Sequence, residues 1–247
     1  MACMRRPDLP PPPPFSDDWA LFLDVDGTLL DFADAPHRVH VDPDMLEALE
    51  VLHRRLDGAL ALVSGRSLEQ LDHLFAPLRL PAAGLHGLEH RGDGPAAKPP
   101  TPLRTLRGEA RTVALRHPGA VVEDKGATVA LHWRGNPEAE PAMRALAEAA
   151  IAWLPGYSLQ PGDHVLELRP KGANKGAAVA RMLDEAPFAG RTPVFVGDDH
   201  TDEHGFEAVL AHDGIAVLVG DRQPSCARHG LASPSEVRSW LAEVAQA

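Results

Sequence analysis

Short apolar segments alternate along this chain with longer segments in which apolar residues recur at helical spacing. The short segments are typical of buried strands, and they cover residues 21–25, 59–63, 82–85, 193–196 and 215–219. The longer segments predict helices, with capping residues or first-turn prolines at Asp42-Pro43, Ser67, Asn174 and Ser233-Pro234. Alternation of strands and helices predicts an α/β fold with a mostly parallel sheet.

The middle of the chain has a different character. Residues 91–101 are rich in glycine, proline and alanine, which marks a linker. The next segment predicts a helix, two strands, a second helix and two more strands, over residues 102–116, 121–122, 128–133, 136–153, 157–159 and 164–168. We therefore expect a small α+β domain at residues 101–170, inserted between two parts of a larger core at residues 17–100 and 171–247.

The composition narrows the class of protein. The 247 residues carry a formal net charge of −11, which argues against nucleic acid or an anionic membrane as the main partner. No apolar run reaches the roughly 18 residues of a membrane span, and the prolines at 10–14 stand where a signal peptide needs an apolar segment. Cys3 and Cys226 are the only cysteines, so no disulfide framework is expected. We expect a cytoplasmic monomer with a disordered, proline-rich tail at residues 1–16.

The strongest chemical signal stands directly after the first predicted strand, in the run Asp24-Val25-Asp26-Gly27-Thr28. Side chains alternate in direction along an extended chain, so Asp24 and Asp26 are expected to point to the same side. Carboxylates that close repel each other unless a cation neutralises them, which indicates a hard divalent metal ion beside a nucleophilic carboxylate. An Asp-rich turn after a strand is the alternative for this motif taken by itself.

A second acidic cluster, residues 197–203, also follows an apolar strand, so a parallel sheet can place it beside Asp24. We expect Asp198 to bind Mg²⁺ directly, while Asp199 and Asp202 orient water molecules bound to the metal. The alternative is an acidic first turn of a helix. That alternative suits Asp202 but leaves two acids at the mouth of the strand unexplained.

Ser64 and Lys175 complete the polar groups at predicted strand and helix ends. Ser64 closes the second strand, where its hydroxyl and the N–H groups of the following helix can hold a phosphate oxygen. Lys175 opens a helix and can reach a phosphoryl group with its ammonium. Each residue has a plain alternative by itself, because serine is a common helix cap and lysines are usually solvated.

In this order, the motifs at Asp24, Ser64, Lys175 and Asp198 resemble those of the haloacid dehalogenase superfamily of phosphatases, from about Asp18 onward. The resemblance implies a Rossmann-like core with a mostly parallel sheet, and it implies that the inserted domain is an α/β cap of the C2B type. A narrower resemblance to trehalose-6-phosphate phosphatases rests on the runs at residues 64–66, 84–89, 122–126, 132–134, 167–170, 174–176 and 197–203. The runs inside the inserted domain are the discriminating ones, because other phosphatases of the superfamily share only the core motifs.

The narrower resemblance implies Mg²⁺-dependent hydrolysis of trehalose 6-phosphate through an aspartyl-phosphate. In that mechanism Asp24 attacks phosphorus, and Asp26, held by Thr28, protonates the departing sugar oxygen and then activates water. Ser64 and Lys175 stabilise the charge on the phosphoryl oxygens. The metal-binding residues that the resemblance implies are Asp24, Asp26, Asp198, Asp199 and Asp202.

The resemblance assigns binding of the sugar phosphate to residues in both parts of the chain: Thr28, Arg66, His86, Gly87, Glu123, Lys125 and Glu167. Glu123, Lys125 and Glu167 are the charged partners that buried sugar hydroxyls need, although ordinary exposed charge is the alternative. His132 and Arg134 stay open as further contacts. The other functions considered are a phosphatase for sucrose phosphate, mannosylphosphoglycerate or a hexose phosphate, and a non-catalytic sugar-phosphate sensor. The sensor is disfavoured because the core carboxylates and the lysine are all present.

Overall fold

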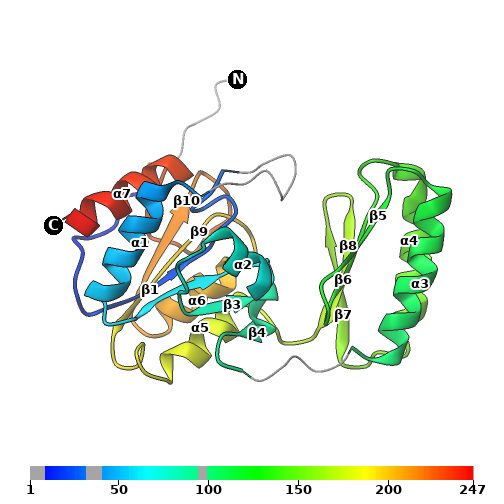
Figure 1. Cartoon of the computed structure of the whole chain (residues 1–247), viewed down its shortest axis with the longest axis horizontal. Coiled ribbons are helices and arrows are strands. Elements are labelled where there is room, and N and C mark those ends of the chain that lie inside the picture. The colour runs from blue at the N-terminus through cyan, green and yellow to red at the C-terminus, as the bar shows by residue number, and fades with distance from the viewer. Residues whose placement is uncertain (1–8, 32–40, 94–98, 247) are drawn as a thin grey trace. The chain divides into compact units, whose positions relative to one another are not determined.

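One part of the chain is inserted into another. The computed structural model describes residues 9–31, 41–93 and 99–246. The chain divides into a core unit, Met1–Gly92 with Asn174–Ala247, and an inserted unit, Asp93–Ala173 (Figure 1). Residues 94–98 of the predicted linker lie outside the described residues.

A seven-stranded sheet forms the centre of the core unit, in the order β11-β10-β9-β1-β2-β3-β4. Its strands are β1 Trp19–Leu23, β2 Leu60–Val63, β3 Ala82–Gly84, β4 Glu89–His90, β9 Thr192–Gly197, β10 Ile215–Val219 and β11 His229–Leu231. Every neighbouring pair is parallel except β3 and β4. All five predicted strands lie in this sheet, which confirms the predicted α/β class. The sequence does not predict β4 and β11, because two and three residues are too few to show an alternating pattern.

Helices cover both faces of this sheet, since β1 and β2 are buried along their whole length. They are α1 Pro43–Arg55, α2 Leu68–Leu74, α5 Lys175–Leu183, α6 Glu203–Leu210 and α7 Pro234–Gln246. α1 packs beside α7, and α5 packs beside α6 (Figure 1). The apolar core joins Phe22 and Leu49 from the first part of the unit to Phe195 and Leu241 from the second. Among the described residues, no helix is long and apolar enough to cross a membrane.

Capping residues begin the core helices where the sequence predicts them. A carboxylate oxygen of Asp42 accepts a hydrogen bond from a backbone N–H in the first turn of α1 at 3.0 Å. Ser67 and Gln70 form both bonds of the predicted capping box at the start of α2. Asn174 Oδ1 accepts from the N–H of Ala177 at 2.8 Å, which fixes the first residue of α5 as Lys175.

The described part of the predicted tail, residues 9–16, packs on the core and is therefore not a disordered segment, which corrects the prediction for these residues. Phe15 packs against the buried apolar cluster. The Gly230 N–H in β11 donates to the carbonyl of Pro10 at 3.0 Å. Prolines lack an N–H but keep a carbonyl acceptor, so this segment can satisfy the outer edge of β11. Residues 1–8, which include Cys3, lie outside the described residues.

The inserted unit is a four-stranded antiparallel sheet with two helices on one face (Figure 1). Its elements are α3 Thr101–Arg116, β5 Val121–Asp124, β6 Val129–His132, α4 Glu140–Ile151, β7 Tyr157–Gly162 and β8 Val165–Pro170, with the strand order β5-β6-β8-β7. This element order agrees with the predicted pattern of helix, two strands, helix and two strands. Leu131 and Leu166 pack with Leu103 and Met143 in a second apolar core. The alternate residues of the strands form the other face, which carries charged side chains.

The start of α4 differs from the prediction. The sequence predicts a helix over residues 136–153, but a 3-10 turn over Pro137–Ala139 comes first and α4 begins at Glu140. The Asn136 side chain donates to the carbonyl of Pro118 at 3.2 Å. The Asn136 side chain makes no capping hydrogen bond to the turn that follows it.

Candidate active site

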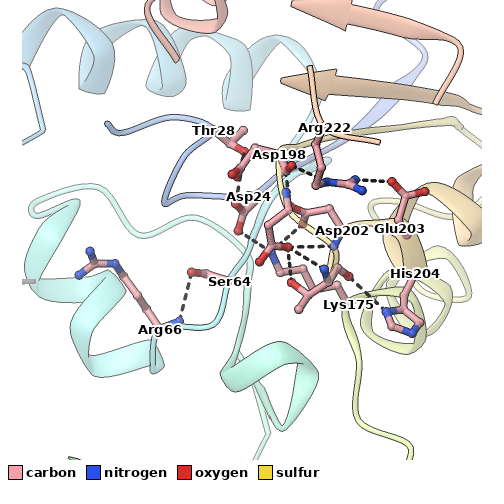
Figure 2. A network of polar contacts seen from close by, with 12 residues as sticks. Asp24, Thr28, Ser64, Arg66, Lys175, Asp198, Asp202, Glu203, His204 and Arg222 are labelled. Atoms are coloured by element: carbon pink, nitrogen blue, oxygen red, sulfur yellow. Dashed lines mark hydrogen bonds and ion pairs between the residues drawn. The ribbon is translucent and has the colours of Figure 1, made fainter. Parts of the chain in front are cut away.

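Four polar side chains meet at one edge of the core sheet (Figure 2). Asp24 follows the end of β1, and Ser64 and Asp198 follow the ends of β2 and β9. β1 runs parallel to both neighbours, so all three residues stand at the carboxyl edge, where open α/β sheets hold their sites. Lys175, the first residue of α5, reaches the same place.

The Lys175 ammonium is buried between two carboxylates. Its Nζ atom lies 2.7 Å from Asp24 Oδ1 and 2.6 Å from Asp202 Oδ1, and all three side chains are almost fully enclosed. Burial raises the pKa of Asp24 and of Asp202 above the ordinary value, although the nearby ammonium works against that rise. Burial lowers the pKa of Lys175, but the two carboxylates outweigh it and the net shift is upward. The lysine therefore stays charged and pairs with Asp24.

Thr28 lies between Asp24 and Asp198, which corrects the expectation that it holds Asp26. Its Oγ1 atom is 3.2 Å from Asp24 Oδ2 and 3.1 Å from Asp198 Oδ1. Gly27 produces this arrangement because its φ of 86° turns the chain sharply. A Cβ atom on Gly27 would lie 2.3 Å from Asp198 Oδ2, so only glycine lets the second carboxylate approach this closely.

Asp26 pairs with Arg66 through two parallel hydrogen bonds. Arg66 Nε lies 2.7 Å from Asp26 Oδ2, and Nη2 lies 2.5 Å from Oδ1. This two-point contact is the strongest geometry that an arginine and a carboxylate can form. Arg66, which the sequence analysis assigns to the substrate, thus engages both side-chain oxygens of Asp26 in this structure.

A tight loop brings His86 and Gly87 next to the Ser64 segment. The His86 N–H donates to the Ser64 carbonyl at 2.9 Å, and both His86 and Gly87 have positive φ angles. The His86 ring lies directly over Gly65, where a Cβ atom would come within 2.8 Å of ring Cε1. Gly87 lies against the start of α5, since a Cβ there would be 2.9 Å from the carbonyl of Asn174. The structure therefore gathers these predicted residues around Ser64 and α5.

Asp202 and Asp199 stabilise the loop that carries Asp198. Asp202 Oδ2 accepts from the N–H groups of Asp198 and Asp199 at 3.0 Å each. Asp199 Oδ1 accepts from the N–H and the hydroxyl of Thr201 at 2.7 Å each. Burial raises the pKa of Asp199, but Lys175 and the Thr201 hydrogen bonds outweigh it and the net shift is downward. Asp202 and Asp199 therefore each use a carboxylate oxygen for hydrogen bonds within the loop that carries Asp198.

The site has the composition of a hard-cation site. Among the described residues, Asp24, Asp198 and Asp202 each offer an oxygen, and these oxygens lie within 4.8 Å of one another. Burial, together with the charges of Asp202 and Asp199, raises the pKa of Asp198 to about 6. Crowded carboxylates with one lysine between them leave negative charge that a divalent cation can neutralise. The donor set therefore fits an oxygen-binding metal ion.

Arg222 is a site residue that the sequence analysis missed. Its Nε atom donates to the backbone carbonyl of Asp198 at 2.9 Å, and its Nη2 atom donates to Glu203 (Figure 2). Asp198 and Arg222 also line a cavity of about 410 Å³ beside the acidic cluster. Its position in the sequence could have identified Arg222, because it stands just after β10 and hence at the same edge of the sheet.

The charged residues predicted in the inserted unit form one cluster. Lys125 Nζ lies 3.4 Å from Glu167 Oε1 and 3.7 Å from Glu123 Oε2. His132 Nε2 lies 3.1 Å from the same Glu123 oxygen, and this hydrogen bond lowers the pKa of Glu123. In the sheet register, Ala130 stands directly between Glu123 and Glu167. This register puts the two carboxylates on one face of the sheet, where the lysine contacts both.

Arg134 lies outside this cluster of Glu123, Lys125, His132 and Glu167. Its guanidinium contacts the Asp163 carboxylate at 2.7 Å, and both side chains are largely exposed. Of the two residues left open by the sequence analysis, only His132 has a contact within the cluster.

Comparison with known proteins adds independent information. A family model described as trehalose-phosphatase matches residues 22–235. A trehalose-6-phosphate phosphatase of Escherichia coli (strain K12) is 42% identical over 233 residues, which cover 93% of this chain and 87% of the relative. A probable trehalose-phosphate phosphatase of Sinorhizobium fredii (strain NBRC 101917 / NGR234) is 42% identical over 234 residues, which cover 93% and 88%. The crystal structure of a trehalose-6-phosphate phosphatase related protein aligns with a TM-score of 0.74 at 28% identity, over 92% of this chain and 96% of that one.

Proposed function

The chain belongs to the trehalose-phosphatase family, and from that premise we propose that it hydrolyses trehalose 6-phosphate to trehalose and phosphate, as a step of trehalose biosynthesis. The family match confirms the resemblance drawn from the sequence motifs, and the fold matches the predicted core with an inserted domain. The observation that carries the proposal within the structure is the buried contact of Asp24 with Lys175, with Asp198 close by. It supplies a nucleophile, a cation and a metal ligand at the mouth of one sheet.

Asp24 is the proposed nucleophile. Its carboxylate attacks phosphorus, the bond from phosphorus to the sugar oxygen breaks, and an aspartyl-phosphate remains. Asp26 gives its proton to the departing sugar oxygen and then takes a proton from the water that hydrolyses the aspartyl-phosphate. For this step Asp26 has to exchange its Arg66 partner for the sugar oxygen, since both of its oxygens contact the guanidinium.

Charge on the phosphoryl group is stabilised by groups already at the sheet edge. Lys175 and the Ser64 hydroxyl are the proposed partners of the phosphoryl oxygens. Asp24, Asp198 and the backbone carbonyl of Asp26 would hold Mg²⁺, which reduces the repulsion between a carboxylate and a phosphate dianion. Asp202 is the proposed positioning residue, because it contacts Lys175 and the amides of the Asp198 loop.

The inserted unit is the proposed source of sugar recognition. Glu123, Lys125 and Glu167 offer two acceptors and a donor group on one face of the sheet, and His132 adds an imidazole. Charged partners of this kind satisfy sugar hydroxyls that lose water on binding. We propose that the protein works as a cytoplasmic monomer, without nucleic acid or membrane as a partner, in keeping with its acidic composition.

Phosphate release from a panel of substrates tests the proposed function. The panel contains trehalose 6-phosphate, sucrose 6-phosphate, glucose 6-phosphate and mannosylphosphoglycerate, each with Mg²⁺ and with a chelator. We expect strong preference for trehalose 6-phosphate, with activity lost in the chelator and restored by Mg²⁺. Preference for another member of the panel would keep the phosphatase chemistry and reject the assignment of the sugar. Silence on all four substrates by folded protein would reject the proposed function.

Glu123→Ala is expected to raise KM for trehalose 6-phosphate roughly 10- to 100-fold, because a charged hydrogen bond to a hydroxyl is lost. Hydrolysis of p-nitrophenyl phosphate, which has no sugar, should change little. Steady-state kinetics with both substrates gives the comparison. Glu148→Ala, an exposed glutamate on α4, is the matched control. Equal losses on both substrates would argue against sugar binding by Glu123.

Mg²⁺ should bind more tightly as pH rises from about 5 to about 7. With a pKa of about 6, Asp198 carries a proton at the lower pH and must release it before it can bind the metal. The affinity is therefore expected to rise about tenfold per pH unit below about pH 6, with release of protons into the buffer. Calorimetry in buffers of different ionisation enthalpy measures both quantities. An affinity independent of pH across this range would exclude Asp198 as a titrating ligand.

A further inference from the structure

A separate cavity of about 390 Å³ lies in the core unit, away from the acidic cluster. Its lining includes Gly58 and Pro81, which stand just before β2 and β3 begin. Ser64 and Asp24 stand where strands end, so the cavity is at the opposite edge of the sheet. Arg181, near the end of α5, also lines it, whereas Lys175 at the start of the same helix is in the active site.

The cavity is basic although the chain as a whole is acidic. The chain has 35 acidic residues against 24 lysines and arginines. In the cavity lining, three arginines (Arg79, Arg91 and Arg181) accompany the carboxylate of Glu185, and the Asp72 carboxylate beside the lining contacts two of them. A local reversal of charge in a recess concentrates anions from solution.

Two of these arginines are held in place by contacts within the protein. Arg91 Nε donates to the carbonyl of Leu80 at 2.6 Å, and its Nη2 contacts Asp72 at 2.5 Å. Arg79 Nη2 lies 3.2 Å from the same carboxylate, while most of its side chain is exposed. Guanidinium groups held by one carboxylate keep further N–H groups for a second anion, at a small cost in side-chain ordering.

The rest of the wall combines an imidazole with apolar surface. His53 Nδ1 is buried and has no hydrogen-bond partner within the described part of the chain. Burial lowers the pKa of His53, so its ring is neutral near pH 7. Met182 and Pro187 add an apolar side. A recess of this volume that combines apolar surface with convergent polar groups is typical of small-molecule sites.

We propose that this cavity binds a small organic phosphate with a flat apolar part, of the nucleotide class, at a site distinct from the phosphatase site. The guanidinium groups of Arg79 and Arg91 pair with the phosphate, since their planar forks match its oxygens. Met182 and Pro187 contact its apolar part.

The test uses AMP as the probe and the full chain, in buffer that contains a chelator so that turnover does not consume the probe. Calorimetric titration should give a single site whose affinity falls at least about tenfold in Arg79→Glu. Arg228→Glu makes the same change of charge at an exposed arginine of the same unit and should bind AMP like the unchanged protein. Inorganic phosphate should bind to the cavity at least about tenfold more weakly than AMP, because it lacks the apolar part.

Ser64→Ala separates the two sites, because it alters the phosphatase site alone. AMP binding that is weakened by Ser64→Ala and kept in Arg79→Glu would place the probe in the phosphatase site and overturn the proposal. Equal weakening in Arg79→Glu and Arg228→Glu, or no AMP binding to the unchanged protein, would also overturn it. Arg79→Gln replaces Arg79→Glu if the latter does not fold, with the same expected direction.

Discussion

Asp24→Asn is expected to lower turnover of trehalose 6-phosphate by at least about 10⁴-fold while the protein remains folded. The amide keeps the size of the side chain but cannot attack phosphorus, so no aspartyl-phosphate forms. It also removes the charge that pairs with Lys175 at 2.7 Å. Single-turnover assays with Mg²⁺ measure the loss, and circular dichroism confirms that the fold is kept.

The control for this experiment is Asp184→Asn, which changes an exposed aspartate at the end of α5 and should retain full activity. Acid quenching of the unchanged enzyme during turnover should trap phosphate on the protein, and the Asp24→Asn variant should trap none. An Asp24→Asn variant with near-normal turnover would remove Asp24 from the role of nucleophile.

Lys175→Met should lower the free energy of unfolding by about 3–5 kcal/mol in metal-free buffer, besides abolishing activity. The substitution leaves Asp24 and Asp202 buried without their shared cation, and an unpaired buried charge is strongly destabilising. Urea unfolding followed by fluorescence measures the change. The double variant Lys175→Met/Asp202→Asn should recover part of the loss, because one of the two stranded charges is removed.

Lys171→Met is the matched control for this stability prediction, since Lys171 is exposed and its Nζ contacts the carbonyl of Pro155 alone among the described residues. It should change the free energy of unfolding by less than about 0.5 kcal/mol. A loss of less than about 1 kcal/mol in Lys175→Met would mean that the buried contacts of Lys175 do not stabilise the fold.

The sequence was enough to locate the edge of the sheet where the site lies. Asp24, Ser64 and Asp198 each follow an apolar run, and in a parallel sheet the ends of such runs meet. The assignment of Glu123, Lys125 and Glu167 to sugar binding came from the resemblance to trehalose-6-phosphate phosphatases, and the structure adds that Glu123 and Glu167 lie on strands that share a neighbour. The prediction of the sheet edge depends only on where strands end, which the pattern of apolar residues records directly.

The partners of individual side chains could not be predicted in the same way. Thr28 contacts Asp24 and Asp198 instead of Asp26, because the turn at Gly27 redirects it. The pairing of Asp26 with Arg66 joins residues that are 40 positions apart. Such contacts depend on rotamers and on turn geometry, which a pattern of polar and apolar positions does not encode.

The prediction of a disordered proline-rich tail was wrong for residues 9–16 for a related reason. Its composition favours an exposed chain, yet Pro10 supplies a carbonyl to the edge of β11 and Phe15 adds apolar contact with the core. Whether an edge strand such as β11 finds a hydrogen-bond partner depends on which other segments of the chain reach that edge. This is a property of the whole fold.

The interruption of the core unit by the inserted unit has a consequence for protein synthesis. β1 pairs with β2 on one side and with β9 on the other, and Asp24 meets Lys175 across 151 positions of chain. During synthesis, β1 can pair with β2 as soon as both have left the ribosome. Its other edge therefore stays unpaired until β9 emerges. The strands of the inserted unit pair with one another, and the unit is complete by Ala173. The nascent chain thus passes through a stage at which the inserted unit is complete and the core sheet is not. At that stage Asp24 has no cation beside it, and the unpaired edge of β1 is the part that a chaperone would need to protect.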